Sequence, residues 1–255
     1  ILVVYPLFFI FISSFKKTEE LYSFTWSLPK NWDYSPYIRL FTEYGFGTAF
    51  KNSLLYSAIC CIITIILITT AAYGIARMKW KLSKLALGFI MTGIMIPVHA
   101  IVIPLYITAS QVNLPRVYIL MLIYIATSIP TSLFIMVGFM ESVPRTLEEA
   151  AVLDGCSIIP AFISIICPIL KPPLATITIL NFNGIWNDYM MALIFVDSDK
   201  YKTVQLAVTN FNSGTSTNYP MLLSAIVVAL VPSVVVCVFM TDKLTSGITA
   251  GSIKA

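Results

Sequence analysis

Long apolar runs recur along this sequence and restrict the folds open to it more than any other feature. Of its 255 residues, 58% are hydrophobic and 11% are charged, whereas soluble domains carry about 25% charged residues. So few polar side chains cannot cover a surface in water. Because a backbone in lipid must satisfy its own hydrogen bonds, runs of this length predict an all-α, polytopic membrane protein with six transmembrane helices. The predicted spans are about 1–15, 50–76, 85–108, 117–140, 173–196 and 220–241.

The first of these segments, 1–15, is shorter than the roughly 20 residues that a spanning helix needs. It has neither the basic leader nor the small-residue cleavage site of a signal peptide. The sequence therefore predicts a truncated first span, and the whole chain, 1–255, is expected to form a single transmembrane domain.

Positive charges set the predicted orientation in the membrane. The connection 77–84 carries four cations and no acidic residue, so by the positive-inside rule it is cytoplasmic. Alternation then places the loop 141–172, the tail 242–255 and the N-terminus in the cytoplasm as well. The segments expected outside are 16–49, 109–116 and 197–219.

The loop 141–172 opens with the signals of a short helix. Thr146 and Glu149 have the spacing of a capping box, in which each side chain bonds the other residue's backbone. Glu148 and Glu149 would both lie in the first turn, where the helix dipole favours negative charge. Gly155 can adopt the left-handed backbone angles that close a helix.

A second short helix is predicted directly after the first. Ser157 can cap its start, and Pro168 is expected to end it. The two helices, 147–153 and 157–166, would form a pair between membrane spans. Such a pair can fit a groove on a soluble partner.

Through these residues the chain resembles the permease subunits of bacterial ABC importers. Their cytoplasmic loop carries Glu-Ala-Ala, three residues, Gly, nine residues and then Ile-x-Leu-Pro. The matching residues here are Glu149-Ala150-Ala151, Gly155, Ile165 and Pro168, with Cys167 in place of leucine. Further stretches, which extend the resemblance to nearly the whole chain and indicate the second, maltose-permease type of carbohydrate importers, are Asn52-Ser53-Leu54, Trp186-Asn187-Asp188 and 247–254.

The resemblance implies a multi-pass subunit of the bacterial cytoplasmic membrane that forms half of an ATP-driven sugar pathway. This chain would bind no cofactor, because ATP and Mg²⁺ would belong to a cytoplasmic ABC ATPase dimer. Its other partners would be a second homologous permease, an extracellular solute-binding protein, and a sugar or oligosaccharide. The residues expected to transmit the motion of the ATPase are Glu148, Glu149, Ala150, Ala151, Asp154 and Gly155.

The tail is a second expected contact with the ATPase, because the matching family segment reaches into the ATPase dimer. Gly251 permits a close backbone approach, and Ile248 and Ile253 are apolar side chains that a free tail would expose to water. The alternative is a frayed terminus, which is common at chain ends.

Asp188 is the one acid well inside an apolar segment, and a charge in a span is costly enough to indicate function. Asn183 and Asn187 would share a helix face, with Trp186 beside them, and amide and aromatic groups suit polyol ligands. We expect a polar stripe along a sugar path. It is equally open that these residues hold helices together through hydrogen bonds.

An amphipathic helix is predicted in the first outer loop. Pro36 would lie in its first turn, and Tyr37, Leu40 and Phe41 recur at helical spacing. It either anchors the loop among lipid headgroups or contacts an external binding protein.

Other functions fit the sequence less well. An ion-coupled secondary transporter using Asp188 would need inverted repeats and usually more charges in the membrane, and no repeat is visible. A non-transporting membrane scaffold would not explain the cappable helix pair. The sequence contains no phosphate-binding loop and no hydrolase motif, which argues against an enzyme. The dispersed net charge of +4 does not indicate nucleic-acid binding, and the spacing of the five cysteines indicates neither a metal site nor a disulfide.

Overall fold

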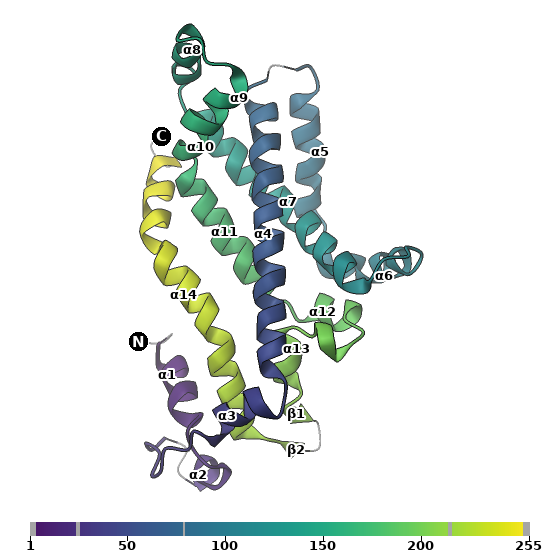
Figure 1. Ribbon diagram of the computed structural model, residues 1–255, viewed down its shortest axis with the longest axis vertical. Coiled ribbons are helices and arrows are strands. Elements are labelled where there is room, and N and C mark those ends of the chain that lie inside the picture. The colour runs from purple at the N-terminus through teal and green to yellow at the C-terminus, as the bar shows by residue number, and fades with distance from the viewer. Residues whose placement is uncertain (1–3, 24–25, 79, 214–215, 252–255) are drawn as a thin grey trace. The chain divides into compact units, whose positions relative to one another are not determined.

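The computed structural model of the chain is built almost entirely from helices (Figure 1). It describes residues 4–23, 26–78, 80–213 and 216–251, with side chains through Met240 except at Ser213 and Ser216. Among these residues the single sheet is a short antiparallel pair, β1 (Asn212–Ser213) and β2 (Ser216–Thr217). Asn212 lies opposite Thr217 in this pair.

Three helices in the described part of the chain are long and apolar enough to cross a membrane. They are α4 (Phe46–Ala76), α7 (Arg116–Ser142) and α14 (Tyr219–Gly251), the last through its part Tyr219–Met240. Two bent combinations of helices raise the number of candidate spans to as many as five. The apolar helix α1 (Val4–Ser13) has only 10 residues.

The first bent combination replaces the continuous span predicted at 85–108. It consists of α5 (Ser83–Met95), the 3-10 helix η1 (Val98–Ile101) and α6 (Val102–Ser110), with a bend of 86°. Pro97 causes the break, because a proline forces the residue before it into an extended conformation. Ile96 accordingly has a ψ of 113°.

The second bent combination covers the end of the loop 141–172 and the predicted fifth span. Its first arm is α9 (Ile158–Ala161), the π-helix η2 (Phe162–Ile166) and α10 (Cys167–Ile169), and its second arm is α11 (Lys171–Trp186), bent by 70°. The span predicted at 173–196 is wrong in its second half. Helix α11 ends at Trp186, and a separate helix, α12 (Met190–Phe195), follows.

Short helices complete the fold. They are α2 (Thr18–Ser23), α3 (Ser35–Thr42), α8 (Thr146–Leu153), η3 (Asp199–Tyr201) and α13 (Val204–Thr209). Helix α3 confirms the helix predicted at this position, with Pro36 in its first turn. Of the apolar face predicted for it, Leu40 is buried, whereas Phe41 is 51% exposed. The carboxylate of Asp33, just before α3, accepts a hydrogen bond from the amide of Ser35 at 2.9 Å. Hydrogen bonds from the Ser35 side chain and backbone lower the pKa of the Asp33 carboxyl.

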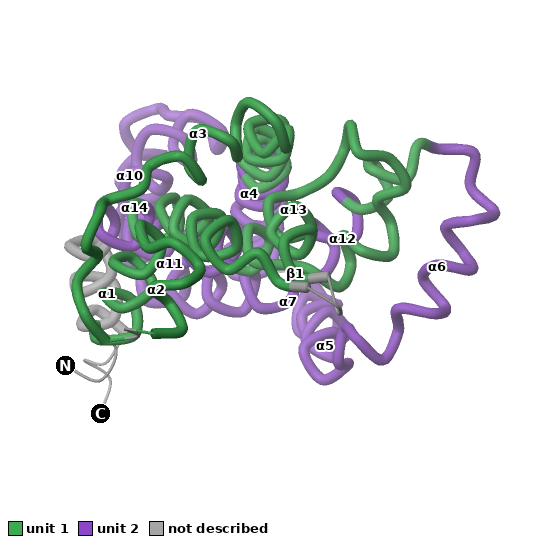
Figure 2. The backbone as a smooth tube through the Cα atoms, turned by 90° about the horizontal axis from the view of Figure 1, so that it is seen from below, with its two compact units in different colours: residues 1–57, 115–120, 184–235 green, residues 58–114, 121–183, 236–255 purple. Residues whose placement is uncertain are grey.

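The chain forms two compact units (Figure 2). The first unit comprises 1–57, 115–120 and 184–235, and the second comprises 58–114, 121–183 and 236–255. Large buried side chains of the first unit include Leu40, Phe46, Trp186 and Phe195.

The core of the second unit lies where α4 and α7 meet the segment η2–α11. Its fully buried members are Ile68, Ala72, Leu133, Met136, Met140, Ile166, Leu170 and Ile177. In the same unit α5 approaches α7 closely, because a Cβ added at Gly93 would lie 2.8 Å from Cγ of Pro130. This core includes Ile166 of the loop 141–172, which is predicted to carry function.

Candidate functional site

The predicted first helix of the cytoplasmic loop is present as α8, but its start differs from the prediction. Arg145 occupies the N-cap position and Thr146 is already helical, with no side-chain capping bond. The capping box predicted for Thr146 and Glu149 is therefore wrong. The amides of Glu148 and Glu149 donate instead to the Arg145 carbonyl at 3.0 and 3.1 Å. Both glutamates lie in the first turn, as expected.

Gly155 closes α8 as predicted. Its φ is +83°, and its amide donates to the Val152 carbonyl at 3.0 Å. The next amide, of Cys156, donates to the Ala151 carbonyl at 2.9 Å. This pair of bonds is a Schellman motif, which satisfies carbonyls that the end of a helix leaves without a partner.

The second helix of the pair is longer and less regular than predicted. Ser157 lies at the N-cap position with extended backbone, although its side chain makes no capping bond. Pro168 was predicted to end the helix, but it lies in the first turn of α10. A proline is tolerated there because the first turn leaves amides unpaired, and the π-helical turn η2 directly precedes it.

The end of α4 holds the start of α8 through two arginines. Nε of Arg77 lies 3.4 Å from Oε1 of Glu148, and Nη2 of Arg77 donates to the Val143 carbonyl at 2.7 Å. In return, Nη2 of Arg145 donates to the Ala76 carbonyl at 2.9 Å. No local spacing connects Arg77 to Glu148, so the sequence indicates only the contribution of Arg77 to membrane orientation.

The other predicted coupling residues face outward, with one exception. Glu149, Ala150, Asp154 and Gly155 are exposed, whereas Ala151 is buried. The Glu149 carboxylate has no partner among the residues that the structure describes. Apolar side chains near it are also exposed, Leu153 to 88%. The exposed apolar set, named here the α8–η2 patch, is Leu147, Val152, Leu153, Ile158, Ile159 and Ile163.

The polar residues at the end of α11 are arranged differently from the predicted stripe. Asn187 and Asp188 lie beyond the last helical residue, Trp186, so Asn187 does not share a helix face with Asn183. The Asp188 carboxylate accepts the amides of Met191 at 3.4 Å and Ala192 at 3.0 Å, at the start of α12. Asp188 is thus an acid at a helix break and not inside a continuous span.

Trp186 offers almost no surface to a ligand. It is 1% exposed, and its indole N–H donates to the Ala229 carbonyl at 2.9 Å. Its ring meets the ring of Phe50 edge-on, with centroids 5.4 Å apart. Asn187 is exposed and accepts a hydrogen bond from Gln205 at 3.4 Å. Asn183, in the second unit, is half-buried and donates to the Ile179 carbonyl at 3.1 Å.

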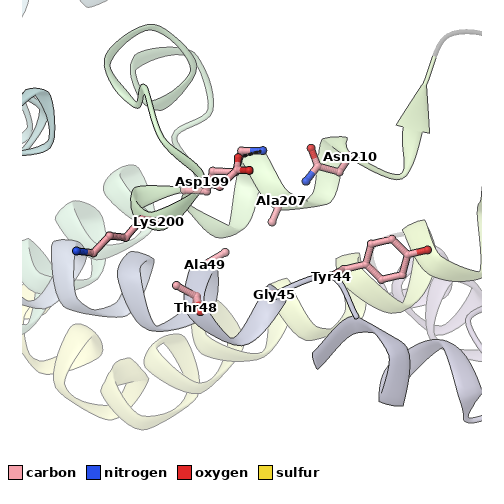
Figure 3. A pocket seen from close by; sticks show the side chains of 9 residues that line it. Tyr44, Gly45, Thr48, Ala49, Asp199, Lys200, Ala207 and Asn210 are labelled. Atoms are coloured by element: carbon pink, nitrogen blue, oxygen red, sulfur yellow. Dashed lines mark ion pairs between the residues drawn. The ribbon is translucent and has the colours of Figure 1, made fainter. Parts of the chain in front are cut away.

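The first unit contains a recess of about 280 Å³ between the start of α4 and the segment η3–α13 (Figure 3). Its rim includes an ion pair between Nζ of Lys202 and Oδ1 of Asp199 at 2.7 Å. The recess is lined by Tyr44, Gly45, Thr48, Ala49, Asp199, Lys200, Lys202, Ala207 and Asn210.

Asn52 holds one wall of this recess in place. Its amide nitrogen donates to the carbonyls of Lys200 at 2.8 Å and Lys202 at 3.0 Å. The Tyr56 hydroxyl donates to the carbonyl of Tyr201 at 3.3 Å. The stretch Asn52-Ser53-Leu54, which contributed to the family resemblance, therefore fixes the segment around Lys200 and Lys202 on α4.

The tail is described in part. Helix α14 continues to Gly251, through residues that were expected to form a separate segment after 241. The side chain of Ile248, and Ile253 as a whole, lie outside the described part of the chain. Among the described residues, no group of three His, Cys, Asp or Glu side chains is placed to hold a metal ion.

The fold of this chain is similar to that of a solved transporter structure. A chain of a bacterial ABC transporter involved in the import of the acidic polysaccharide alginate superposes with a TM-score of 0.82. The match covers 94% of this chain and 90% of that chain at 20% sequence identity. At this identity the likeness establishes the fold.

Sequence comparisons identify the family. A putative ABC transporter permease of Caldicellulosiruptor sp. (strain Rt8B.4) is 33% identical over 98% of this chain and 91% of that protein. A multiple sugar-binding transport system permease of Streptococcus mutans is 30% identical, covering 100% of this chain and 93% of that protein. The family model "Binding-protein-dependent transport system inner membrane component" matches residues 65–249. The chain therefore belongs to this family of ABC importer permease subunits, which are transport components and not enzymes.

Proposed function

We propose that this chain is one permease half of an ATP-driven carbohydrate importer in the bacterial cytoplasmic membrane. Its relatives include the sugar permease of Streptococcus mutans and a melibiose, raffinose and stachyose import permease of Bacillus subtilis, the latter 29% identical over 97% of this chain. The observation that carries the proposal is the exposed α8–η2 patch beside the unpaired Glu149 carboxylate. ATP and Mg²⁺ would be bound by the partner ATPase.

The α8–η2 patch has the chemistry of a helix that docks in a groove. Its apolar side chains would lose contact with water on docking, and the exposed Ala150 would let the partner backbone approach closely. Glu149 would meet a cationic group of the ATPase. The closed turn at Gly155 keeps α8 short, so a movement of the groove would turn the helix pair as one body.

Six spans and a cytoplasmic position of the loop 141–172 are part of this proposal. Helix α1, the three long helices and the two bent combinations would make up the six spans. The contact between Arg77 and Glu148 supports the orientation, because residues that touch must lie on the same side of the membrane. Since 77–84 is cationic, that side is the cytoplasm.

On the outer side, the solute-binding protein would meet the first unit. The recess lined by Tyr44, Thr48 and Asn210 would receive polar side chains of that protein or the arriving sugar. Asn187 is the proposed sugar contact of the first unit and Asn183 that of the second, while the buried Trp186 and the helix-capping Asp188 hold the end of α11. Family membership leaves the ion-coupled alternative without support.

The tail is also proposed to reach the ATPase. The continuous course of α14 to Gly251 supports this proposal. A continuous helix extends the chain beyond the last span in one fixed direction, which a frayed end does not. The second homologous permease would complete the pathway.

The proposal is tested by sugar uptake into proteoliposomes that contain the complex purified with its partners. ATP enclosed on the ATPase side, together with added binding protein, should drive uptake. Uptake should persist when proton and sodium gradients are dissipated by ionophores. Uptake by this chain alone, or uptake abolished by the ionophores while ATP is present, would contradict the proposal.

A further inference from the structure

Two arginines connect the last turn of α4 with the start of the cytoplasmic loop, entirely within the second unit. Arg77 bonds Val143 and pairs with Glu148, while Arg145 bonds the carbonyl of Ala76 at the end of α4. Each side of the contact thus donates to the other. None of these residues belongs to the sequence motif that identifies the cytoplasmic loop, although Glu148 directly precedes it.

The central ion pair is shielded from water. The Arg77 side chain is 5% exposed and the Glu148 side chain 18% exposed. Nε of Arg77 and Oε1 of Glu148 have no hydrogen-bond partner elsewhere in the described residues, so each depends on the other. Removing one partner would leave the remaining charge buried and uncompensated, which is strongly unfavourable.

A second contact joins α4 to the same loop, one turn before Arg77 in the sequence. The rings of Tyr73, on α4, and Phe162, on η2, have centroids 4.7 Å apart. Both side chains pack against the core that contains Ile68 and Ile166. The end of α4 is therefore fixed to α8 by charge and to η2 by packing, and Figure 1 shows α8 and α9 beside this end of α4.

The two adjacent glutamates of α8 have different surroundings. Glu148 turns toward Arg77, whereas Glu149 is exposed. A force applied to α8 from outside would reach Glu149 and the α8–η2 patch first. It would pass through Glu148 and Arg77 into α4 without any flexible loop between them.

We propose that Arg77 and Glu148 form a latch through which movement of α8 is transmitted to α4, so that the second span takes part in the transport cycle. Both act as positioning residues, because neither would touch the sugar or ATP. The inference rests on the proposed function, in which the ATPase moves α8. The spans that directly flank the cytoplasmic loop would receive that motion through the chain itself. The latch would pass it to α4 as well.

The test uses the whole complex in proteoliposomes and measures sugar imported per ATP hydrolysed. Arg77→Gln and Glu148→Gln each remove one charge of the pair, and the amide in Glu148→Gln keeps the shape of the side chain. Both should lower sugar per ATP by roughly tenfold, within the usual range of coupling between two sites. Lys81→Gln removes an exposed cation of the same connection and should change the ratio by less than about twofold.

Two further measurements separate transmission from simple stability. The charge-swapped double variant Arg77→Glu with Glu148→Arg should restore most of the lost ratio, because it rebuilds the pair. A cysteine at the exposed Met78 should react with a maleimide at different rates without nucleotide and with ATPase trapped by vanadate. In Arg77→Gln that difference should disappear, although ATP is still hydrolysed.

Wild-type sugar per ATP in both single variants, or a Met78→Cys labelling difference that survives Arg77→Gln, would overturn the latch. These outcomes are distinct from a failure of the proposed function. If the proposed function were wrong, the wild-type complex itself would show no ATP-driven uptake.

Discussion

The hydroxyl oxygen of Ser53, in the third turn of α4, accepts a hydrogen bond from the backbone amide of Val204 at 2.8 Å, and both residues are buried. Val204 is the first residue of α13, whose amide has no partner within its own helix. The bond therefore caps α13 from a different part of the chain. Together with Asn52 it fixes the segment η3–α13, which forms one wall of the recess.

Ser53→Ala should destabilise the first unit by about 1–3 kcal/mol, because it leaves the Val204 amide buried without an acceptor. The measurement is thermal unfolding of the purified complex in detergent. Ser57→Ala is the matched control, since Ser57 is also buried on α4 but its hydroxyl has no partner among the described residues. Equal losses from the two substitutions would show that the Ser53 bond contributes nothing specific.

Gly93→Ala should destabilise the second unit by about 1–3 kcal/mol, the usual effect of forcing an extra methyl group into a packed contact. The added Cβ would lie 2.8 Å from Cγ of Pro130. Gly88→Ala, on the same helix with no atom within 4 Å of an added Cβ, should be neutral or stabilising. If Gly93→Ala unfolds at a higher temperature than Gly88→Ala, the close approach of α5 and α7 is disproved.

Gly155→Ala should weaken binding of the ATPase, because alanine at a φ of +83° costs roughly 1–2 kcal/mol and disturbs the end of α8. Binding is measured by recovery of the ATPase with the tagged permease over a range of ATPase concentrations. Gly45→Ala introduces the same kind of strain, at a φ of +63°, in the first unit. It should leave ATPase recovery unchanged, and equal effects would argue for general destabilisation.

Glu149→Lys should reduce ATP-driven sugar uptake by at least tenfold, since it reverses an exposed charge expected to meet a cation of the ATPase, and charges of like sign across an interface repel strongly. Uptake and ATP hydrolysis are measured together in proteoliposomes. Glu141→Lys reverses another exposed acid, near the end of α7, and should retain uptake. Normal uptake in Glu149→Lys would remove this residue from the coupling surface.

Local sequence signals predicted the features that depend on one residue and its neighbours. Gly155 closes α8 with left-handed backbone angles, and α3 begins with proline in its first turn. The long apolar runs correctly gave α4, α7 and α14, because composition and length alone identify a spanning helix.

Features set by distant residues could not be predicted in this way. Glu148 was expected only in the first turn of its helix, where the dipole favours a negative charge, whereas its partner is Arg77, directly after the end of α4. The break after Trp186 is stabilised by Asp188 and by the contacts of Trp186 with Phe50 and Ala229. No periodic pattern in the sequence marks these contacts. Pro97 was visible in the sequence, but the 86° size of the bend depends on packing.

The most direct test of the central claim is whether α8 touches the ATPase. Leu153→Cys, placed at the most exposed position of the α8–η2 patch, is combined with a cross-linker that reacts with a thiol at one end and is photoreactive at the other, in membranes that contain the assembled complex without other cysteines. Ile103→Cys on α6, where the wild-type residue is 72% exposed, is the control. The account predicts a covalent product with the ATPase from position 153 and none from position 103. A transporting complex that gives no ATPase product from position 153 would contradict it.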